Sequence, residues 1–465
     1  MRQKAKLLVA TDVANRHGES HMNTTAPAPV TSPLGQRASF QKECRLLLQG
    51  VVTADTVEGR LARYYKRTSG RWPLLFDFTN AEYVEVAALG NVIAYVMDRR
   101  EKSLLTFLAY PRSKAIRDFF TVWRFPDALS QATGMPFTEF LLAEDQFYLE
   151  EEQSTYDGIG GGLEALEYDP DWNNNALAKR NFFEFTTFRP QPGQAILPEG
   201  PFAAAPRTES RRWAGRLIRE VLNKHLGGES PKDDIARVAI YEAMSNAIRH
   251  PHAKVIQVVS KFERKMKASA KRDIVGTRKV QGNLRICIWD DGDTIADTLH
   301  NVLKKDKSVR AVLLPAFMYE TYAVDIRPFD KSKKQRHIIT AGDDITAANA
   351  TEPRLLLASL FPGITRSVAD SVAAVEPYED ESPQALLAGA PGMGLYALAR
   401  IVVDQFVGTL VIRSGSYRLK MRLPDDRTLK ETKARYWCKI TQYPQTFPRF
   451  RGNLLALQVP VGGGD

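Results

Sequence analysis

The sequence has few of the residues that cross-link small folds or hold metal ions. Its 465 residues include only three cysteines, Cys44, Cys287 and Cys438, which lie far apart in the chain. They make neither a disulfide framework nor a CxxC metal site, so we expect buried thiols. The seven histidines do not cluster, apart from His250 and His252, which flank a proline and cannot be paired ligands on one regular helix face. The sequence therefore predicts no metal site made of protein ligands alone.

Long apolar runs are lacking as well. Hydrophobic residues make up 44% of the chain and charged residues 25%, and no uninterrupted apolar run approaches the length of a membrane span. The amino end opens basic, but its apolar run is too short and too soon interrupted for a signal peptide. We therefore expect a soluble, cytoplasmic protein that does not use a membrane. Because 465 residues exceed what one hydrophobic core usually supports, we also expect at least two domains.

Acidic residues are too few to balance the basic ones. The 64 lysines and arginines face 54 aspartates and glutamates, which gives a formal net charge of +10. The densest basic stretch covers residues 261–285, where no aromatic residue follows Phe262, so the stacking platforms of a single-strand nucleic-acid binder are missing. Two interpretations stay open: a solvated hairpin extension, which the pattern favours, and a basic face that binds nucleic acid or an acidic partner.

The amino-terminal part of the chain changes character once. Residues 1–39 are rich in proline, alanine, threonine and serine, and they predict a flexible tail. In residues 40–149, strand-like segments at 44–52, 74–78 and 104–110 alternate with helical segments. Such alternation indicates a small α/β layer domain.

A segment of turn composition separates this layer from the rest. Residues 150–206 are rich in glycine, proline, asparagine and aspartate and predict a linker or irregular arm. Within it, NFFEFTTF at residues 181–188 alternates enough to predict one strand, which we expect to join the sheet of the next domain. Residues 207–465 then form a second domain.

The layer domain contains a segment, FDFTNAEYVEVAALG, that resembles the STAS domain of anti-sigma-factor antagonists and sulfate transporters. In that family a strand ends in aspartate, and the next helix begins with an Asp-Ser pair and contains a Leu-Gly step. Here Asp77 matches the strand end, Leu89-Gly90 matches the step, and Glu85-Val86 stands in place of Asp-Ser. Because valine has no oxygen to phosphorylate, the family's regulatory phosphorylation is not expected. The resemblance covers residues 44–134, and an unrelated α/β layer is the alternative.

A polar pair interrupts an apolar helical pattern in IYEAMSNAIRHPHA, residues 240–253. Glu242 and Asn246 are four residues apart, so they project together from one side of the predicted helix, which Pro251 ends. Taken alone, such a pair is typical of a solvated helix edge. The residues that follow change this interpretation.

Two later segments carry the groups that recognise a nucleotide. A strand in NLRICIWDDGDTI brings Asp290 to its end, with Gly292 two residues on, and AGAPGMGL places glycines immediately before a helix. A carboxylate at a strand end can accept a hydrogen bond from the amine of adenine, beside a glycine that permits close approach. Glycine-rich backbone at a helix start suits polyphosphate, and magnesium needs few protein oxygens when phosphate and water supply the rest.

The order and spacing of these segments resemble the GHKL superfamily, the ATP-binding fold shared by DNA gyrase, the large heat-shock chaperone, sensor histidine kinases and mismatch-repair proteins. The resemblance covers residues 207–461. It implies that Glu242 is the catalytic base, that Asn246 is the magnesium ligand, and that Asp290 reads adenine with Gly292 beside it. The second glycine box, which wraps phosphate, corresponds to Gly392, Met393, Gly394 and Leu395.

The sequence departs from the family pattern at three places. The segment DDGDT, residues 290–294, resembles the first glycine box of the family. Thr294 replaces the second glycine of this box, where it either narrows the adenine pocket or supplies its hydroxyl. Ala390-Pro391 stands where the second box usually starts with glycine. The stretch at about 296–390 is long for a nucleotide lid, and a partner surface, a small extra lobe and a solvated loop stay open for it.

Together these features predict an α/β protein in which a STAS-like α/β layer domain (40–149) precedes a GHKL, or Bergerat, α/β sandwich (207–465) with a long lid insertion. The leading hypothesis is a magnesium-dependent ATPase that acts as a switch, with lid closure sensed by the STAS-like domain or a protein partner. One alternative is a serine/threonine protein kinase of the anti-sigma-kinase type. Another is a catalytically degenerate module that binds nucleotide or nucleic acid. Monomer and homodimer both stay open.

Overall fold

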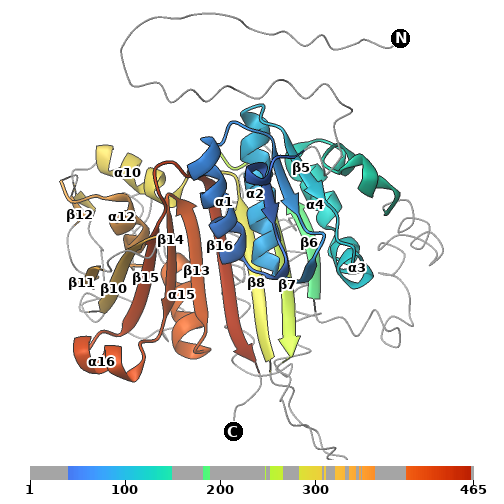
Figure 1. The fold of residues 1–465 in the computed structure, drawn as a ribbon. Coiled ribbons are helices and arrows are strands. Elements are labelled where there is room, and N and C mark those ends of the chain that lie inside the picture. The colour runs from blue at the N-terminus through green and yellow to red at the C-terminus, as the bar shows by residue number, and fades with distance from the viewer. Residues whose placement is uncertain are drawn as a thin grey trace, which may run out of the picture. The chain divides into compact units, whose positions relative to one another are not determined.

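The chain builds one large mixed sheet and a smaller α/β layer that packs on it (Figure 1). This confirms the expected mixed α/β class, whereas the predicted domain boundaries and the two family resemblances stay predictions. The described residues belong to one compact unit. The computed structural model describes residues 40–148, 182–188, 247, 252–264, 282–305, 308–309, 320–329, 335–341, 345–346, 348–361 and 394–461.

The amino-terminal layer alternates strands and helices as predicted. Its parallel sheet has the order β1-β3-β5 and consists of β1 (Arg45–Leu47), β3 (Leu74–Asp77) and β5 (Thr106–Ala109). A second parallel pair joins β2 (Gly50–Val52) to β4 (Ala81–Val84). Its helices are α1 (Ala54–Thr68), α2 (Val86–Glu101), α3 (Lys114–Val122) and α4 (Phe125–Thr133), with 3-10 turns at Lys42–Cys44, Phe137–Glu139 and Ala143–Asp145. The central strand β3 and its neighbour β5 are buried along their whole length, which is typical of parallel strands covered on both faces.

A capping side chain fixes where α1 begins, and the residue before α2 binds both the start of α1 and the large sheet. The Thr53 hydroxyl accepts a hydrogen bond at 3.2 Å from the N–H three residues later, which starts α1. Glu85 precedes α2; its carboxylate accepts the Ala54 N–H at 3.3 Å and pairs with Arg285 of the large sheet. Val86, where the STAS resemblance would place serine, is the first residue of α2 and only 1% exposed. The two helix starts are therefore tied together and to the sheet.

Within the described residues, the large sheet has nine strands in the order β11-β10-β15-β14-β13-β16-β8-β7-β6. They are β6 (Phe182–Phe188), β7 (Ile256–Arg264), β8 (Gly282–Asp290), β10 (Thr321–Pro328), β11 (Gln335–Thr340), β13 (Thr409–Gly415), β14 (Tyr417–Arg422), β15 (Tyr436–Gln442) and β16 (Phe450–Val461). All neighbours are antiparallel except β10 and β15. Strand β6 lies at the edge beside β7, which confirms the strand predicted at 181–188. Helix α16 (Asp426–Thr432) lies between β14 and β15 in the chain.

The stretch expected to be a lid is sheet and core wherever the structure describes it. Helices α10 (Ile295–Lys305) and α12 (Glu352–Ala358) contribute buried apolar side chains to the core, and β10 and β11 extend the large sheet. Tyr322, Ala323 and Val324 of β10 are fully buried. Two short strands, β9 (Ser308–Val309) and β12 (Ile345–Thr346), pair with each other. The described parts of this stretch thus form helices and sheet, the lid role stays a prediction, and residues 362–393 lie outside the described part.

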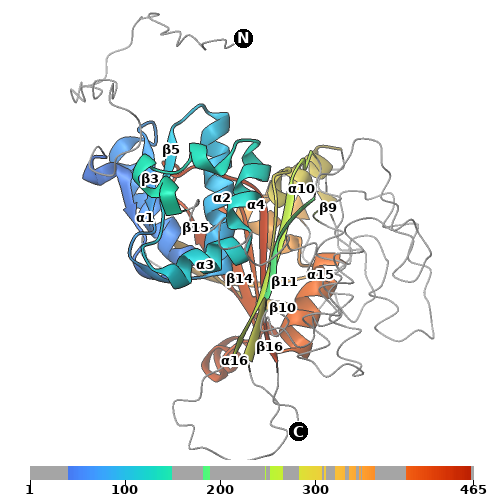
Figure 2. The same cartoon turned by 90° about the vertical axis from the view of Figure 1, so that its right-hand side faces the viewer.

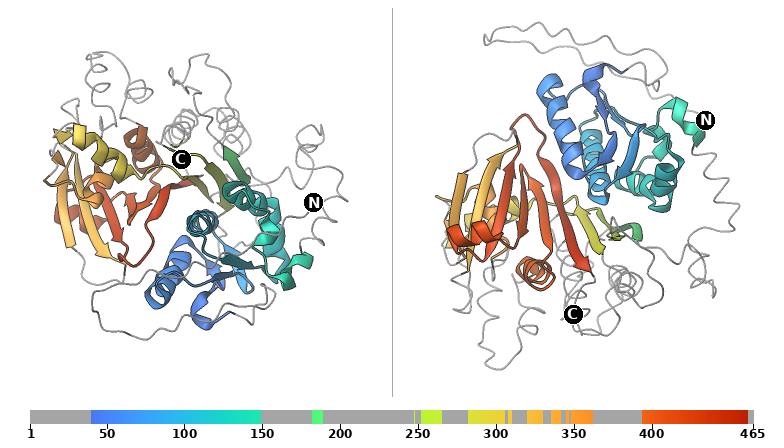
Figure 3. Two further views of the ribbon diagram at one scale, coloured as in Figure 1. Left: turned by 90° about the horizontal axis from the view of Figure 1, so that it is seen from above. Right: turned by 60° about the horizontal axis from the view of Figure 1, so that its bottom comes forward.

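Both faces of the large sheet are covered (Figure 2). Helices α10, α12 and α15 (Gly394–Arg400), which continues into a π-helix at Ile401–Gln405, share one core with the sheet, and the amino-terminal layer shares the other. Side chains alternate along β8, so Ile286 and Ile288 enter the first core while Cys287 and Trp289 enter the second. Seen from above, the layer and α10 lie on opposite sides of the sheet (Figure 3).

Close packing and a buried polar bridge join the amino-terminal layer to the sheet. A Cβ atom on Gly90 of α2 would lie 3.3 Å from a Leu454 methyl group, so the small residue of the Leu-Gly step lets α2 approach β16. Glu58 of α1 is fully buried and pairs with Arg413 at 2.8 Å and with Arg418 at 3.1 Å. Removing one partner of such a buried pair leaves an uncompensated charge, so this bridge fixes the layer on the sheet.

The three cysteines are free and buried, as predicted, and burial raises the pKa of the Cys287 and Cys438 thiols. Strands β7 and β8 pair antiparallel from their first to their last residues, so the basic stretch at 261–285 begins and ends as a hairpin. Its residues 265–281 lie outside the described part, and nucleic-acid binding stays a prediction. Nowhere in the described ranges does a helix combine the length and apolar character that crossing a membrane needs.

Candidate functional site

The end of β8 places the predicted adenine-reading carboxylate in a buried turn. Asp290 is the last residue of β8 and is 2% exposed. The Gly292 N–H donates to Asp290 Oδ1 at 3.0 Å, and the Asn453 amide donates to Oδ1 at 3.3 Å and to Oδ2 at 3.4 Å. The carboxylate is thus held in one orientation at the strand end, with Gly292 beside it, as the sequence predicts.

Strand β16 reaches this turn through a glycine. Gly452 has φ +66°, and a Cβ atom there would lie 1.7 Å from the Asp290 carbonyl oxygen. No other residue could occupy this position without moving the turn, because both the left-handed backbone and the close approach exclude a side chain. Gly452 therefore lets the next residue, Asn453, pair in register with Asp290.

Asn453 connects three elements at this turn and was not predicted from the sequence. Its side chain is buried; Nδ2 also donates to the Asp293 carbonyl at 2.9 Å, and Oδ1 accepts from Ile295 N–H at 3.0 Å and from the Ser414 hydroxyl at 2.7 Å. Through these bonds it joins the end of β8, the start of α10 and the end of β13. The only sequence signal is a polar residue at the edge of the apolar run NLLALQVPV, which does not by itself indicate a site.

Thr294, which stands where the GHKL pattern has a glycine, caps the start of α10. Its hydroxyl donates to Asp297 Oδ2 at 2.7 Å and accepts from the Asp297 N–H at 3.2 Å and from Arg449 Nη2 at 3.2 Å. A hydroxyl has one donor and two acceptor positions, and these three contacts fill them. These contacts hold the Thr294 hydroxyl within the chain, and its two predicted roles, supplying its hydroxyl to the adenine pocket or narrowing that pocket, stay predictions.

A second carboxylate in the turn links it to the amino-terminal layer. Asp291 is 3% exposed, and its Oδ1 accepts the N–H groups of Lys254 and Val255 at 2.6 and 2.8 Å. Burial is the main reason that the pKa of Asp291 is raised. Its Oδ2 lies 3.3 Å from Arg451 Nη2, and Arg451 also pairs with Glu101, the last residue of α2. One arginine thus contacts both the turn and the layer.

The other predicted site residues are only partly described. Glu242, Asn246, Gly392 and Met393 lie outside the described residues. Ala247, next to Asn246, is helical and 1% exposed, in the same core as α10. Gly394 begins α15, and Leu395 packs against this core as well. The structure therefore brings Asp290 and Gly292 together. It also places Ala247, which follows Asn246, and Leu395 of the second glycine box in one core on the same face of the sheet.

A buried ionic network anchors the helix of the second glycine box. Glu320 is 5% exposed and accepts hydrogen bonds from the Tyr396 hydroxyl at 3.2 Å and from Arg435 Nη1 at 3.1 Å. Arg400 lies 3.4 Å from the same carboxylate, and Asp404 binds Arg435 at 2.8 Å. Burial raises the pKa of Glu320 despite these cations. Because each charge in this network has a counter-charge, we interpret it as an anchor for α15.

The end of β8 offers a carboxylate acceptor held in a fixed orientation. An exocyclic amine needs an acceptor, and the buried Asp290 carboxylate, fixed by backbone and amide N–H groups, is one. Within the described ranges, no group of three or more histidine, cysteine, aspartate or glutamate side chains could hold a metal ion. Comparisons with models of protein families, with curated proteins and with solved structures found no match for this chain.

Proposed function

We propose that the carboxy-terminal part of the chain binds ATP, with its adenine amine donating to Asp290. The observation that carries the proposal is the buried Asp290 carboxylate at the end of β8, oriented by Gly292 and Asn453. A carboxylate held in one orientation at a strand end beside a glycine can accept a hydrogen bond from the adenine amine, which supports a recognition role.

The GHKL resemblance implies which other residues complete the nucleotide pocket. Asn246 would hold magnesium, Gly392, Met393, Gly394 and Leu395 would surround the phosphates, and Glu242 would orient or deprotonate the attacking group. Bound ATP and magnesium supply a phosphoryl group whose developing charge the metal neutralises. The catalytic glutamate is typically worth about 10²–10⁴ in rate, which makes it the most informative residue for testing turnover.

The amino-terminal layer is proposed to sense this site. Ala247, α10 and Leu395 share one core, whereas the layer packs on the opposite face of the sheet. A protein group that receives the γ-phosphate has to reach the face of the sheet on which we place the nucleotide. The layer lies on the other face, which favours a sensing role for it over the role of a phosphorylated substrate. Arg451, which contacts both Asp291 and Glu101, offers a direct connection between the two.

Magnesium-dependent phosphate release by the purified chain tests this function. Glu242→Ala is expected to abolish release and to retain nucleotide binding, since the base acts on the attacking group and not on the adenine. Equal turnover in the variant would refute the assignment of the base. The kinase alternative predicts transfer of labelled γ-phosphate to a separate protein, and the degenerate-module alternative predicts binding without either reaction.

A further inference from the structure

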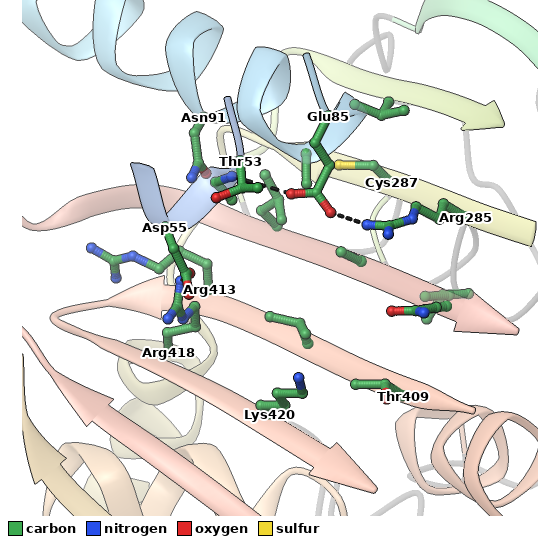
Figure 4. A pocket seen from close by; sticks show the side chains of 18 of the residues that line it. Thr53, Asp55, Glu85, Asn91, Arg285, Cys287, Thr409, Arg413, Arg418 and Lys420 are labelled. Atoms are coloured by element: carbon green, nitrogen blue, oxygen red, sulfur yellow. Dashed lines mark hydrogen bonds and ion pairs between the residues drawn. The ribbon is translucent and has the colours of Figure 1, made fainter. Parts of the chain in front are cut away.

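A cavity of about 320 Å³ lies between the amino-terminal layer and the large sheet. The starts of α1 and α2 form one wall, and β8, β13, β14, β15 and β16 form the other (Figure 4). Its sheet residues Arg413, Leu454 and Ala456 face the layer, on the side away from Ala247 and α10. The cavity is therefore distinct from the proposed nucleotide site.

The charges around this cavity do not balance. Three carboxylates line it, and each pairs with an arginine that also lines it: Glu85 with Arg285, Glu58 with Arg413, and Asp55 with Arg418. Two lysines, Lys420 and Lys439, line it too, and no ion pair or hydrogen bond to either is found in the part of the chain that the structure describes. The lining thus has an excess of positive charge located at two ammonium groups.

These two lysines are direct cross-strand neighbours. Lys420 of β14 and Lys439 of β15 stand opposite each other in the strand register, and both side chains border the cavity. Like charges at this position destabilise a sheet. Burial, together with nearby arginines such as Arg418, lowers the pKa of both lysines. A bound anion would relieve this repulsion.

The opposite wall offers an unsatisfied polar group. Asn91 of α2 is 1% exposed, and its Oδ1 has no hydrogen-bond partner within the chain as described. Figure 4 shows its side chain directed from α2 toward the cavity, beside Thr53. A buried amide oxygen without a donor costs free energy, and a ligand group that donates a hydrogen bond to it recovers that cost. The amino end of α2, where Val86 and Ala87 follow the N-cap residue Glu85, also borders this cavity.

We propose that this cavity binds a small molecule that carries a phosphate group, with the phosphate between Lys420 and Lys439 and a polar group against Asn91. Lysines bind phosphate as point charges, and the volume is at the lower end of small-molecule sites. Because its two walls come from the layer and from the sheet, the ligand stabilises their contact. This site does not depend on the nucleotide proposal.

Calorimetric titration of the full chain, without nucleotide, tests the site with inorganic phosphate, ribose 5-phosphate and ribose. Inorganic phosphate and ribose 5-phosphate are expected to bind, and ribose is not. Lys420→Gln and Lys439→Gln are each expected to weaken both anions about tenfold. Lys430→Gln, on the exposed helix α16, is the matched control and leaves both affinities unchanged. Asp290→Asn, which disturbs the nucleotide site, leaves them unchanged as well.

The Asn91→Leu variant distinguishes the binding of inorganic phosphate from the binding of a phosphate ester. It also tests the site if a lysine variant fails to fold. It keeps the affinity for inorganic phosphate but loses any preference for ribose 5-phosphate, since only the ester reaches the amide. Tighter binding of the ester identifies a phosphorylated metabolite, and equal binding identifies free phosphate. An equal loss in Lys430→Gln, or no binding of either anion to the wild-type chain, would overturn the proposal.

Discussion

Two regions of this molecule bury polar side chains, and they differ in how these side chains are satisfied. In the turn after β8, Asp290, Asp291, Thr294 and Asn453 bind one another and the neighbouring backbone. In the cavity on the opposite face, Asn91 Oδ1 has no hydrogen-bond partner among the described residues. A satisfied network holds groups in fixed orientations, whereas an unsatisfied one gains free energy from a ligand. The first region is built to present a carboxylate, and the second to receive an anion.

The largest effect should come from breaking the satisfied bridge that joins the layers. Glu58→Ala removes the carboxylate that pairs with Arg413, which is 1% exposed, and is expected to lower the free energy of unfolding by about 3–5 kcal/mol. Asp55→Ala on the same helix removes a carboxylate that is 72% exposed and should cost less than about 1 kcal/mol. Urea unfolding measures both variants, and similar losses would contradict a buried bridge.

Removing the amide that connects the turn should have the next largest effect. Asn453→Ala leaves the Ile295 N–H and the Ser414 hydroxyl without this acceptor, so we expect a loss of about 2–3 kcal/mol in unfolding free energy. It should also weaken ATP binding, because Asp290 loses an orienting donor. Gln458→Ala, on the same strand and partly exposed, is the control. A variant with unchanged stability would show that the turn does not need this residue.

A smaller effect is expected from the cap of α10. Thr294→Ala removes the hydroxyl that accepts the Asp297 N–H and should cost about 1 kcal/mol. Because the hydroxyl is occupied within the chain, ATP affinity should stay the same. Thermal unfolding and nucleotide titration on one preparation measure both quantities. A large loss of ATP affinity with little change in stability would indicate that the Thr294 hydroxyl binds the nucleotide.

The smallest effect is expected at the unsatisfied face. Lys439→Gln removes one of two opposed charges and should raise the unfolding free energy at neutral pH, by less than about 1 kcal/mol. The pKa of Lys439 is lowered in the folded chain, so the wild-type protein gains stability as pH rises through that lowered value and the lysine loses its charge first in the folded state. The difference between variant and wild type should therefore shrink in alkaline solution. A constant difference would contradict charge repulsion.

The sequence predicted local features of the fold better than distant pairings. Alternation and flanking turn residues located β3 up to Asp77, β8 up to Asp290 and β6 at the sheet edge. Strand β10 was missed as part of the sheet, because its neighbour β15 lies more than a hundred residues later and no local pattern records that pairing.

The same limit applies to the candidate sites. Asp290 and Gly292 were identified because they are adjacent, whereas Asn453 contacts Asp290 across 163 residues of sequence. The cavity could not be predicted for a related reason: Asn91, Lys420 and Lys439 each resemble an ordinary helix or strand residue until folding brings them together. The contact of the Thr294 hydroxyl with Arg449 could not be predicted either, because Arg449 is also distant in the sequence.

The central claim is that Asp290 reads the adenine of ATP, and one comparison of affinities tests it most directly. ATP binding to the wild-type chain, to Asp290→Asn and to Asp293→Asn should be measured with magnesium, with Asp293 as the control because it lies in the same turn and contacts the exposed His252. We expect Asp290→Asn to weaken ATP by about ten- to hundredfold, as the loss of a charge-assisted hydrogen bond predicts, and Asp293→Asn to bind normally. Equal affinity of all three proteins for ATP would contradict the proposal that Asp290 binds adenine.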